Sequence, residues 1–208
     1  MNQPHTQNPE RTAEYLARMA ARGAELKQQL QHILTAPQDF TWEVGCGHGH
    51  FLTAYAQANP DQICIGIDLA AERIARAERK RTRARLPNLF FLQAEATLFL
   101  DVIPAHARIS RLFVLFPDPW PKSRHHKHRV MQTSFLTQAA AHAANTSELY
   151  FRTDYRPYFE DTDALIRSHT AWHLAATPWP FEYATVFQSR AAEFHSLVAR
   201  RSPTTASS

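Results

Sequence analysis

A single carboxylate between two prolines, followed by an aromatic ring and a run of cations, is the segment of this chain best suited to chemistry. Residues 116–129 read Phe-Pro-Asp-Pro-Trp-Pro-Lys-Ser-Arg-His-His-Lys-His-Arg. Because proline fixes φ and lacks an amide donor, Asp118 is predicted to lie on a stiff loop. The apolar run 109–115 before it is typical of a buried strand, so the carboxylate follows a strand end. This loop favours a cationic or ring-shaped nucleic-acid substrate, and a structural turn with a solvated basic face is the alternative.

A second segment carries three glycines, Gly45, Gly47 and Gly49, between a predicted strand at 40–44 and a predicted helix at 51–58. Glycine permits positive φ and lets backbone N–H groups approach a ligand closely. The spacing differs from the dinucleotide pattern Gly-x-Gly-x-x-Gly. A tight turn without a ligand is the alternative interpretation.

Acids accompany the ends of the first three predicted strands. Glu43 precedes the glycines, Asp68 ends the second strand, and Glu95 follows the third, near an expected adenine position. Asp68 could accept the hydroxyls of a ribose, cap the following helix, or do both. Both S-adenosylmethionine and NAD carry adenine and ribose, but Glu43 would repel a pyrophosphate and attract a cationic methionine end. The acids therefore favour S-adenosylmethionine, with a dehydrogenase as the second hypothesis.

The composition is that of a globular protein. The 208 residues are 44% hydrophobic, and a net charge of +4 weakly favours a nucleic-acid partner. Cations gather in residues 73–85 and again in residues 122–129. Cys46 and Cys64 lie in no metal-binding spacing, which indicates a reducing, cytoplasmic setting. The N-terminus lacks an apolar signal core and no run reaches membrane-spanning length, so no membrane association is expected.

Strands and helices alternate along most of the chain. Strands are expected at 40–44, 62–67, 89–93, 109–115 and 148–152; helices at 9–36, 51–58, 70–85, around 98, 130–144 and 158–169; and a closing strand pair near 172–176 and 194–200. This alternation predicts an α/β fold with a mostly parallel sheet covered on both faces. We expect an N-terminal extension and helix (1–36), one domain (37–201) and a disordered tail (202–208).

With these residues in place, the chain resembles the bacterial tRNA (guanine-N7)-methyltransferase family from about residue 40 to residue 190. The most specific match is the Phe-Pro-Asp-Pro-Trp segment with its following cations. Further matches are residues 43–49, 66–68, 95–96, 153–154 with Tyr158, and Thr185-x-Phe187-x-x-Arg190. Two positions depart from the family pattern: Gln188 replaces a usual Glu, and Ala191 replaces a usual Gly. The basic segment expected before the first strand is also not evident.

The resemblance implies a Rossmann-like, seven-stranded class I methyltransferase sheet that uses S-adenosylmethionine to form N7-methylguanine in the variable loop of tRNA. It implies two sets of site residues. The cofactor set is Glu43, Gly45, Gly47, Gly49, Asp68, Glu95 and Asp118. The substrate set is Lys122, Arg124, Asp154, Thr185, Phe187, Gln188 and Arg190.

Guanine N7 keeps a free lone pair, so methyl transfer needs no general base, and Asp118 is predicted to stabilise the positive charge that develops on the purine. The cations at 122, 124, 127 and 129 are predicted to meet phosphates, and Trp120 to stack or, in preference, to pack. His125, His126 and His128 lack a cysteine partner and lie among cations, so no metal site is expected. A monomer or homodimer is expected. The rival hypotheses are a related methyltransferase acting on another RNA or a small molecule, and a non-catalytic RNA-binding relative.

Overall fold

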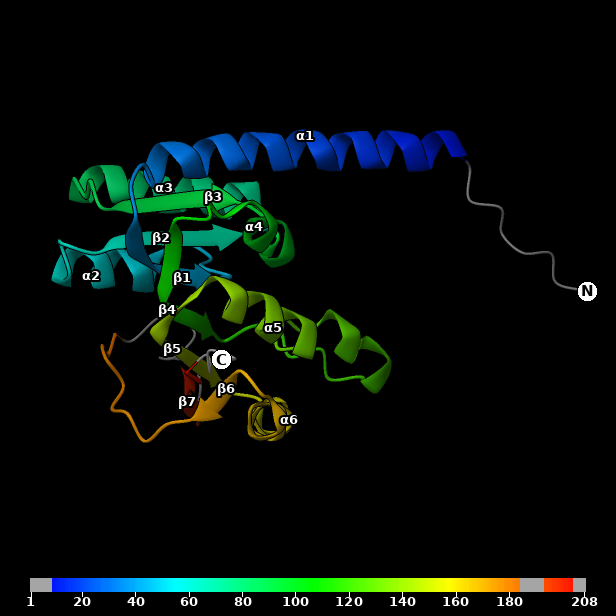
Figure 1. Ribbon diagram of the computed structural model, residues 1–208, viewed down its shortest axis with the longest axis vertical. Coiled ribbons are helices and arrows are strands. Elements are labelled where there is room, and N and C mark those ends of the chain that lie inside the picture. The colour runs from blue at the N-terminus through cyan, green and yellow to red at the C-terminus, as the bar shows by residue number, and fades with distance from the viewer. Residues whose placement is uncertain (1–8, 184–192, 204–208) are drawn as a thin grey trace, which may run out of the picture.

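The computed structural model describes residues 9–183 and 193–203, and these form one seven-stranded sheet with helices on both faces (Figure 1). The spatial order of the strands is β3-β2-β1-β4-β5-β7-β6. The first five strands are parallel, and β7 runs antiparallel to both of its neighbours. The strands are β1 (Gln38–Val44), β2 (Ile63–Asp68), β3 (Leu89–Gln93), β4 (Ala107–Leu115), β5 (Ala143–Thr153), β6 (Trp172–Leu174) and β7 (His195–Arg201). The helices are α1 (Pro9–Ile33), α2 (His50–Ala58), α3 (Ala71–Ala84), α4 (Ala96–Val102), α5 (Thr133–His142) and α6 (Arg156–Ser168), with a short 3₁₀ helix η1 (Ser123–His128).

Two apolar cores lie on opposite faces of the sheet. One includes α1, α4, α5 and α6, where Trp42 of β1 stacks on Phe99 of α4 with ring centroids 4.7 Å apart. The other includes α2 and α3, where Phe51 meets Phe113 of β4 edge to face. Both faces are covered because parallel strands need crossover helices, and the strands are accordingly apolar on both sides. The N-terminal part of α1 projects beyond the sheet (Figure 1).

The structure confirms the predicted α/β class and the parallel sheet, and it corrects several boundaries. The expected helix at 130–144 spans only Thr133–His142, and Ala143 already begins β5, an eleven-residue strand. Alanine-rich sequence has no strong period, so the neighbouring strand β4 decides where the helix ends. The basic run at 123–128, for which no element was expected, forms η1. No helix within the described ranges is long and apolar enough to cross a membrane.

Candidate active site

The carboxyl ends of the parallel strands meet at one edge of the sheet, and backbone hydrogen bonds tie the loops that leave them. Cys46 N–H donates to the carbonyl of Ile67 at 2.9 Å, and Ala94 N–H donates to the carbonyl of Asp68 at 3.2 Å. The strand order reverses between β1 and β4, whose loops carry the glycines and Asp118. In open α/β sheets such a switch point is where ligands bind. The predicted acids Glu43, Asp68 and Asp118 therefore lie at or near the carboxyl edge of the sheet, where a ligand can bind.

The glycine turn owes its form to two different requirements. Gly45, Gly47 and Gly49 all have positive φ, which L side chains rarely adopt. At Gly49 there is also no room for a side chain, because a Cβ atom there would lie 2.5 Å from the Phe91 ring and 2.8 Å from Cβ of Ala77. Gly49 therefore lets α2 approach β3 and α3, whereas Gly45 and Gly47 shape the backbone that a ligand would meet.

Glu43 is a buried carboxyl group with an unsatisfied oxygen. Its side chain is 4% exposed, and Oε2 has no hydrogen-bond partner among the described residues. Burial, and secondly the charge of Asp68, raises the pKa of Glu43 from 4.5 to about 8, although a hydrogen bond from the backbone of Leu52 lowers it. A buried oxygen of this kind is costly unless a partner arrives. The site therefore suits a ligand that brings a positive charge and a hydrogen-bond donor, as the methionine end of S-adenosylmethionine would.

Asp68 is buried at the end of β2 and already organises the backbone. Its Oδ2 accepts a hydrogen bond from Gly47 N–H at 3.0 Å, and its Oδ1 accepts one from Ala70 N–H at 2.8 Å. Ala70, not Asp68, is the N-cap residue of α3, so the capping alternative is not what the structure adopts. Each carboxylate oxygen accepts more than one hydrogen bond, which leaves capacity for ribose hydroxyls. Asp68 thus joins the glycine turn to the start of α3, and Arg73 Nη1 lies 3.6 Å from its Oδ2.

The loop after β4 holds Asp118 between two strained aromatic residues. Phe116 and Trp120 have φ of 49° and 42°, and each precedes a proline. Positive φ is rare for bulky side chains, and proline restricts the residue before it further. Such strain persists only where the surroundings over-determine the backbone, and it concentrates at functional sites. Asp118 itself is exposed at the strand edge.

The buried side chain of Arg129 is hydrogen-bonded to this loop. This finding corrects the prediction that Arg129 binds phosphate. The residue is 5% exposed, and its Nε donates to the carbonyl of Pro119 at 2.8 Å. Its Nη1 donates to Asp161 at 2.6 Å, and the guanidinium lies over the Tyr158 ring at 4.5 Å. A cation buried in this way cannot also meet a phosphate. Arg129 instead anchors the Asp118 loop to α6.

Arg152 supports the same loop from β5, and sequence reasoning missed it. The Phe116 N–H donates to the Arg152 carbonyl at 2.7 Å. The guanidinium is buried, forms two hydrogen bonds with Glu182 at 2.9 and 3.0 Å, and lies 4.0 Å from the Trp179 ring centroid. The sequence did carry a signal, because Arg152 ends the apolar run Leu-Tyr-Phe-Arg of a predicted strand. A charge buried in a core needs a partner, so this arginine could have been predicted to form an ion pair.

The remaining predicted residues divide into three groups. Glu95 is the exposed N-cap residue of α4 and Asp154 is exposed after β5, both beside the strand ends. Lys122 and Arg124 are exposed at the start of η1, where cations can reach a phosphate. The positions Thr185, Phe187, Gln188 and Arg190, with the departure at Ala191, lie outside the described residues.

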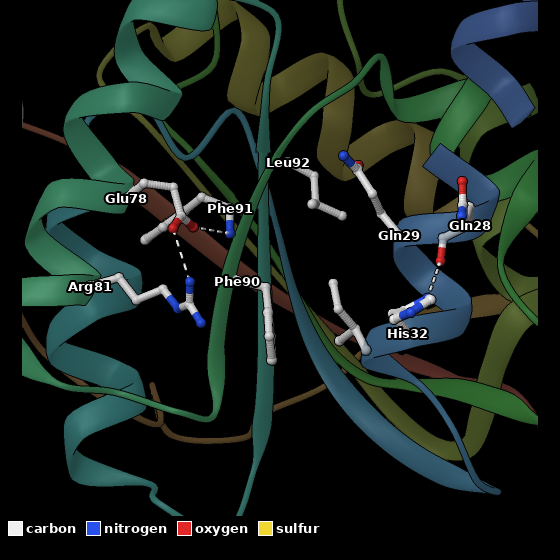
Figure 2. Close-up of a pocket in the computed structure, with 9 residues that line it drawn as sticks. Gln28, Gln29, His32, Glu78, Arg81, Phe90, Phe91 and Leu92 are labelled. Atoms are coloured by element: carbon white, nitrogen blue, oxygen red, sulfur yellow. Dashed lines mark hydrogen bonds and ion pairs between the residues drawn. The ribbon is translucent and has the colours of Figure 1, made fainter. Parts of the chain in front are cut away.

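A groove of about 430 Å³ lies away from these acids, at the free edge of β3 (Figure 2). Its walls are α1, with Gln29 and His32, and α3, with Glu78 and Arg81. Glu78 accepts a hydrogen bond from the Phe91 N–H at 3.1 Å, so a side chain satisfies an outward-facing donor of this edge strand. This arrangement protects the edge from pairing with another strand. Within the described ranges no group of three His, Cys, Asp or Glu could hold a metal ion.

The fold is that of the class I methyltransferases. The structure aligns with the 16S rRNA methyltransferase KamB with a TM-score of 0.59 at 19% identity, over 83% of this chain and 92% of that one. It also aligns with a 16S rRNA (adenine(1408)-N(1))-methyltransferase from Catenulisporales acidiphilia, solved with its cosubstrate SAM, with a TM-score of 0.55 at 16% identity over 86% and 93% of the two chains. At these identities the likeness concerns the fold alone.

Sequence similarity gives the family. Residues 37–201 match the family model described as "Putative methyltransferase". A tRNA (guanine-N(7)-)-methyltransferase of Lachnoclostridium phytofermentans is 30% identical over 171 residues, 76% of this chain and 79% of that protein. The protein of the same name from Brevibacillus brevis is 37% identical over 118 residues, 57% of this chain and 55% of its own length. The match thus spans just over half of some curated relatives. The chain belongs to the tRNA (guanine-N7)-methyltransferase family.

Proposed function

We propose that this chain transfers a methyl group from S-adenosylmethionine to N7 of guanine in tRNA. The observation that carries the proposal is the placement of Asp118. Its rigid, strained loop lies at the same sheet edge as Glu43, the glycine turn and Asp68, with exposed cations following it. The family relationship supports tRNA as the substrate, since the relatives carry that name. A tRNA substrate also agrees with a cytoplasmic location, where Cys46 and Cys64 would remain the free thiols found here.

The residues of the chain fit the proposed cofactor in three places. Glu43 offers a buried acceptor to the cationic amino-acid end, the glycine turn offers backbone, and Asp68 offers oxygens to the ribose. Glu95, at the start of α4, would contact the adenine. When bound, S-adenosylmethionine supplies an electrophilic methyl group on a positively charged sulfur.

The proposed catalytic task is electrostatic. Guanine N7 attacks with its own lone pair, so no side chain has to remove a proton in that step. Positive charge then grows on the purine, and Asp118 would stabilise it while accepting hydrogen bonds from the guanine edge. A fixed anion is effective because little reorganisation is needed. The Arg129 side chain, bonded to the Pro119 carbonyl, and the backbone hydrogen bond from Phe116 to the Arg152 carbonyl would restrain the loop. Asp154, on the loop after the neighbouring strand, would share contacts with the guanine N–H groups.

The substrate would be held by phosphate contacts and by the segment beyond Tyr183. Lys122 and Arg124 would meet phosphates near the target. Thr185, Phe187, Gln188 and Arg190 are proposed substrate residues on the family pattern alone.

The test is methyl transfer from labelled S-adenosylmethionine to unmodified tRNA transcripts, with a 16S rRNA fragment and free guanosine as competing acceptors. Incorporation into tRNA that is lost in Asp118→Asn supports the proposal. Transfer only to the rRNA fragment or to guanosine would show a related methyltransferase with another substrate. Saturable RNA binding without cofactor binding would show a non-catalytic RNA-binding protein.

A further inference from the structure

Trp120 differs from the other tryptophans of the chain. Trp42 and Trp172 are buried in the core, and Trp179 is partly covered and lies against the Arg152 guanidinium. Trp120 is 37% exposed. A partly open indole ring offers an aromatic face on which a planar ligand can stack, and this one follows the proposed catalytic residue Asp118 by two positions. The ring thus packs in part against the protein, as its contacts with two histidines below show, and keeps more than a third of its surface open.

Trp120 has a backbone conformation that its residue type and the following proline both disfavour. Trp120 has a φ of 42° and precedes Pro121, a combination disfavoured for any large side chain. The conformation is maintained because Arg129 holds the carbonyl of Pro119, the residue before it. A strained backbone that displays an aromatic side chain is expected where the side chain has a binding role.

The surroundings of the ring suit a nucleobase. His125 meets Trp120 edge to face with centroids 5.8 Å apart, and His128 lies tilted at 5.1 Å. Both histidines belong to η1, which also carries the exposed cations Arg124 and Lys127. Aromatic platforms interleaved with phosphate-binding cations are how proteins hold unpaired bases.

We propose that Trp120, flanked by His125 and His128, stacks an unpaired nucleobase adjacent to the methylated guanine in the RNA substrate. This inference rests on the proposed function and adds a substrate subsite to it. The base is a neighbour and not the target, because the ring contacts of Trp120 within the described residues are with η1, not with the cofactor side of the site. The platform thus lies on the same side as the phosphate contacts.

Three substitutions of Trp120 distinguish a role in base stacking from a role in holding the loop structure. Trp120→Gly removes the ring and tolerates the positive φ, so relief of the backbone strain offsets part of the lost ring contacts and the variant should fold. It should raise KM for tRNA roughly tenfold, within the range expected for one stacked base, with kcat and S-adenosylmethionine affinity nearly unchanged. Trp120→Phe should restore most of the loss because it keeps a π face, whereas Trp120→Leu should not.

Fluorescence provides a readout that does not depend on methylation. A five-nucleotide oligouridylate, which contains no guanine, should quench tryptophan emission in the wild type and not in Trp120→Phe. An unchanged KM in Trp120→Gly, equal effects of the Phe and Leu variants, or quenching that persists in Trp120→Phe would each overturn the platform. Quenching that depends on Trp120 in a protein that methylates no tRNA would instead overturn the proposed function and leave the platform in place.

Discussion

Replacing Glu43 by glutamine should make the protein more stable and less able to bind its cofactor. With a pKa near 8 the buried carboxyl is mostly protonated at pH 7, whereas in the unfolded chain it ionises near 4.5. Between these values the unfolded state binds fewer protons than the folded state, so the free energy of unfolding falls as pH rises. The loss accumulates at up to about 1.4 kcal/mol per pH unit, with a ceiling of roughly 4 kcal/mol by pH 8.

Glutamine keeps the shape of the side chain and an oxygen for the Leu52 N–H, but it cannot ionise. We therefore expect the stability difference between Glu43→Gln and wild type to be small at pH 5 and to grow steadily up to pH 8. Denaturant unfolding at several pH values measures it. The part of the difference that depends on pH isolates the ionisation from any change in packing.

Cofactor binding should show the opposite trend. A cationic ligand prefers the ionised carboxylate, so the apparent affinity of the wild type for S-adenosylmethionine should rise nearly tenfold per pH unit below about 8. Glu43→Gln should bind more weakly at pH 8 and lose this pH dependence. Methylthioadenosine, which lacks both the amino-acid end and the sulfonium charge, is the control ligand and should bind both proteins alike. Equal S-adenosylmethionine affinities of the two proteins in calorimetry, or a stability difference that does not change with pH, would contradict the role given to Glu43.

Three further changes test other parts of the site. Asp118→Asn should lower kcat about a hundredfold to a thousandfold with little change in cofactor affinity, and wild-type turnover would reduce the loop to a structural role. Arg129→Met should lower the free energy of unfolding by about 1–3 kcal/mol and reduce kcat, because the Pro119 carbonyl loses its donor. It should leave the salt dependence of RNA binding unchanged, and a flatter dependence would return Arg129 to phosphate contact. Neutralising Lys122, Arg124 and Lys127 together should reduce the slope of log RNA affinity against log salt concentration by about two. An unaltered slope would show that these cations only face solvent.

The fold was predictable because its signals are local and repeated. Apolar runs of five to seven residues alternate with helical patterns, and that alternation leaves few arrangements other than a covered parallel sheet. The predictions failed where the signal was weak, as at Ala143, where an alanine-rich helix passes directly into β5. The pairing of β5 with β4 fixes that boundary, and pairing is not written in the local sequence.

The position of the acids at strand ends was predictable for the same reason, since each lies at the end of a recognisable strand or follows it closely. Arg129 was not, because it ends a run of cations and has the same local pattern as its exposed neighbours. Its partner Asp161 lies 32 residues away on α6, and only the folded chain brings the two together. The partial exposure of Trp120 could not be predicted either, because a tryptophan between two prolines can be buried or can face solvent.

The position of the transferred methyl group distinguishes N7 methylation of guanine from every alternative. Unmodified tRNA is incubated with the protein and S-adenosylmethionine, and then cleaved by borohydride and aniline, which break the chain at N7-methylguanine. A parallel transcript carries 7-deazaguanine, in which a carbon replaces N7. If the enzyme methylates N7, we expect one cleavage site at a variable-loop guanine in the normal transcript and no methyl incorporation in the 7-deazaguanine transcript. Equal incorporation into both transcripts, or methylated tRNA that resists cleavage, would contradict N7 methylation.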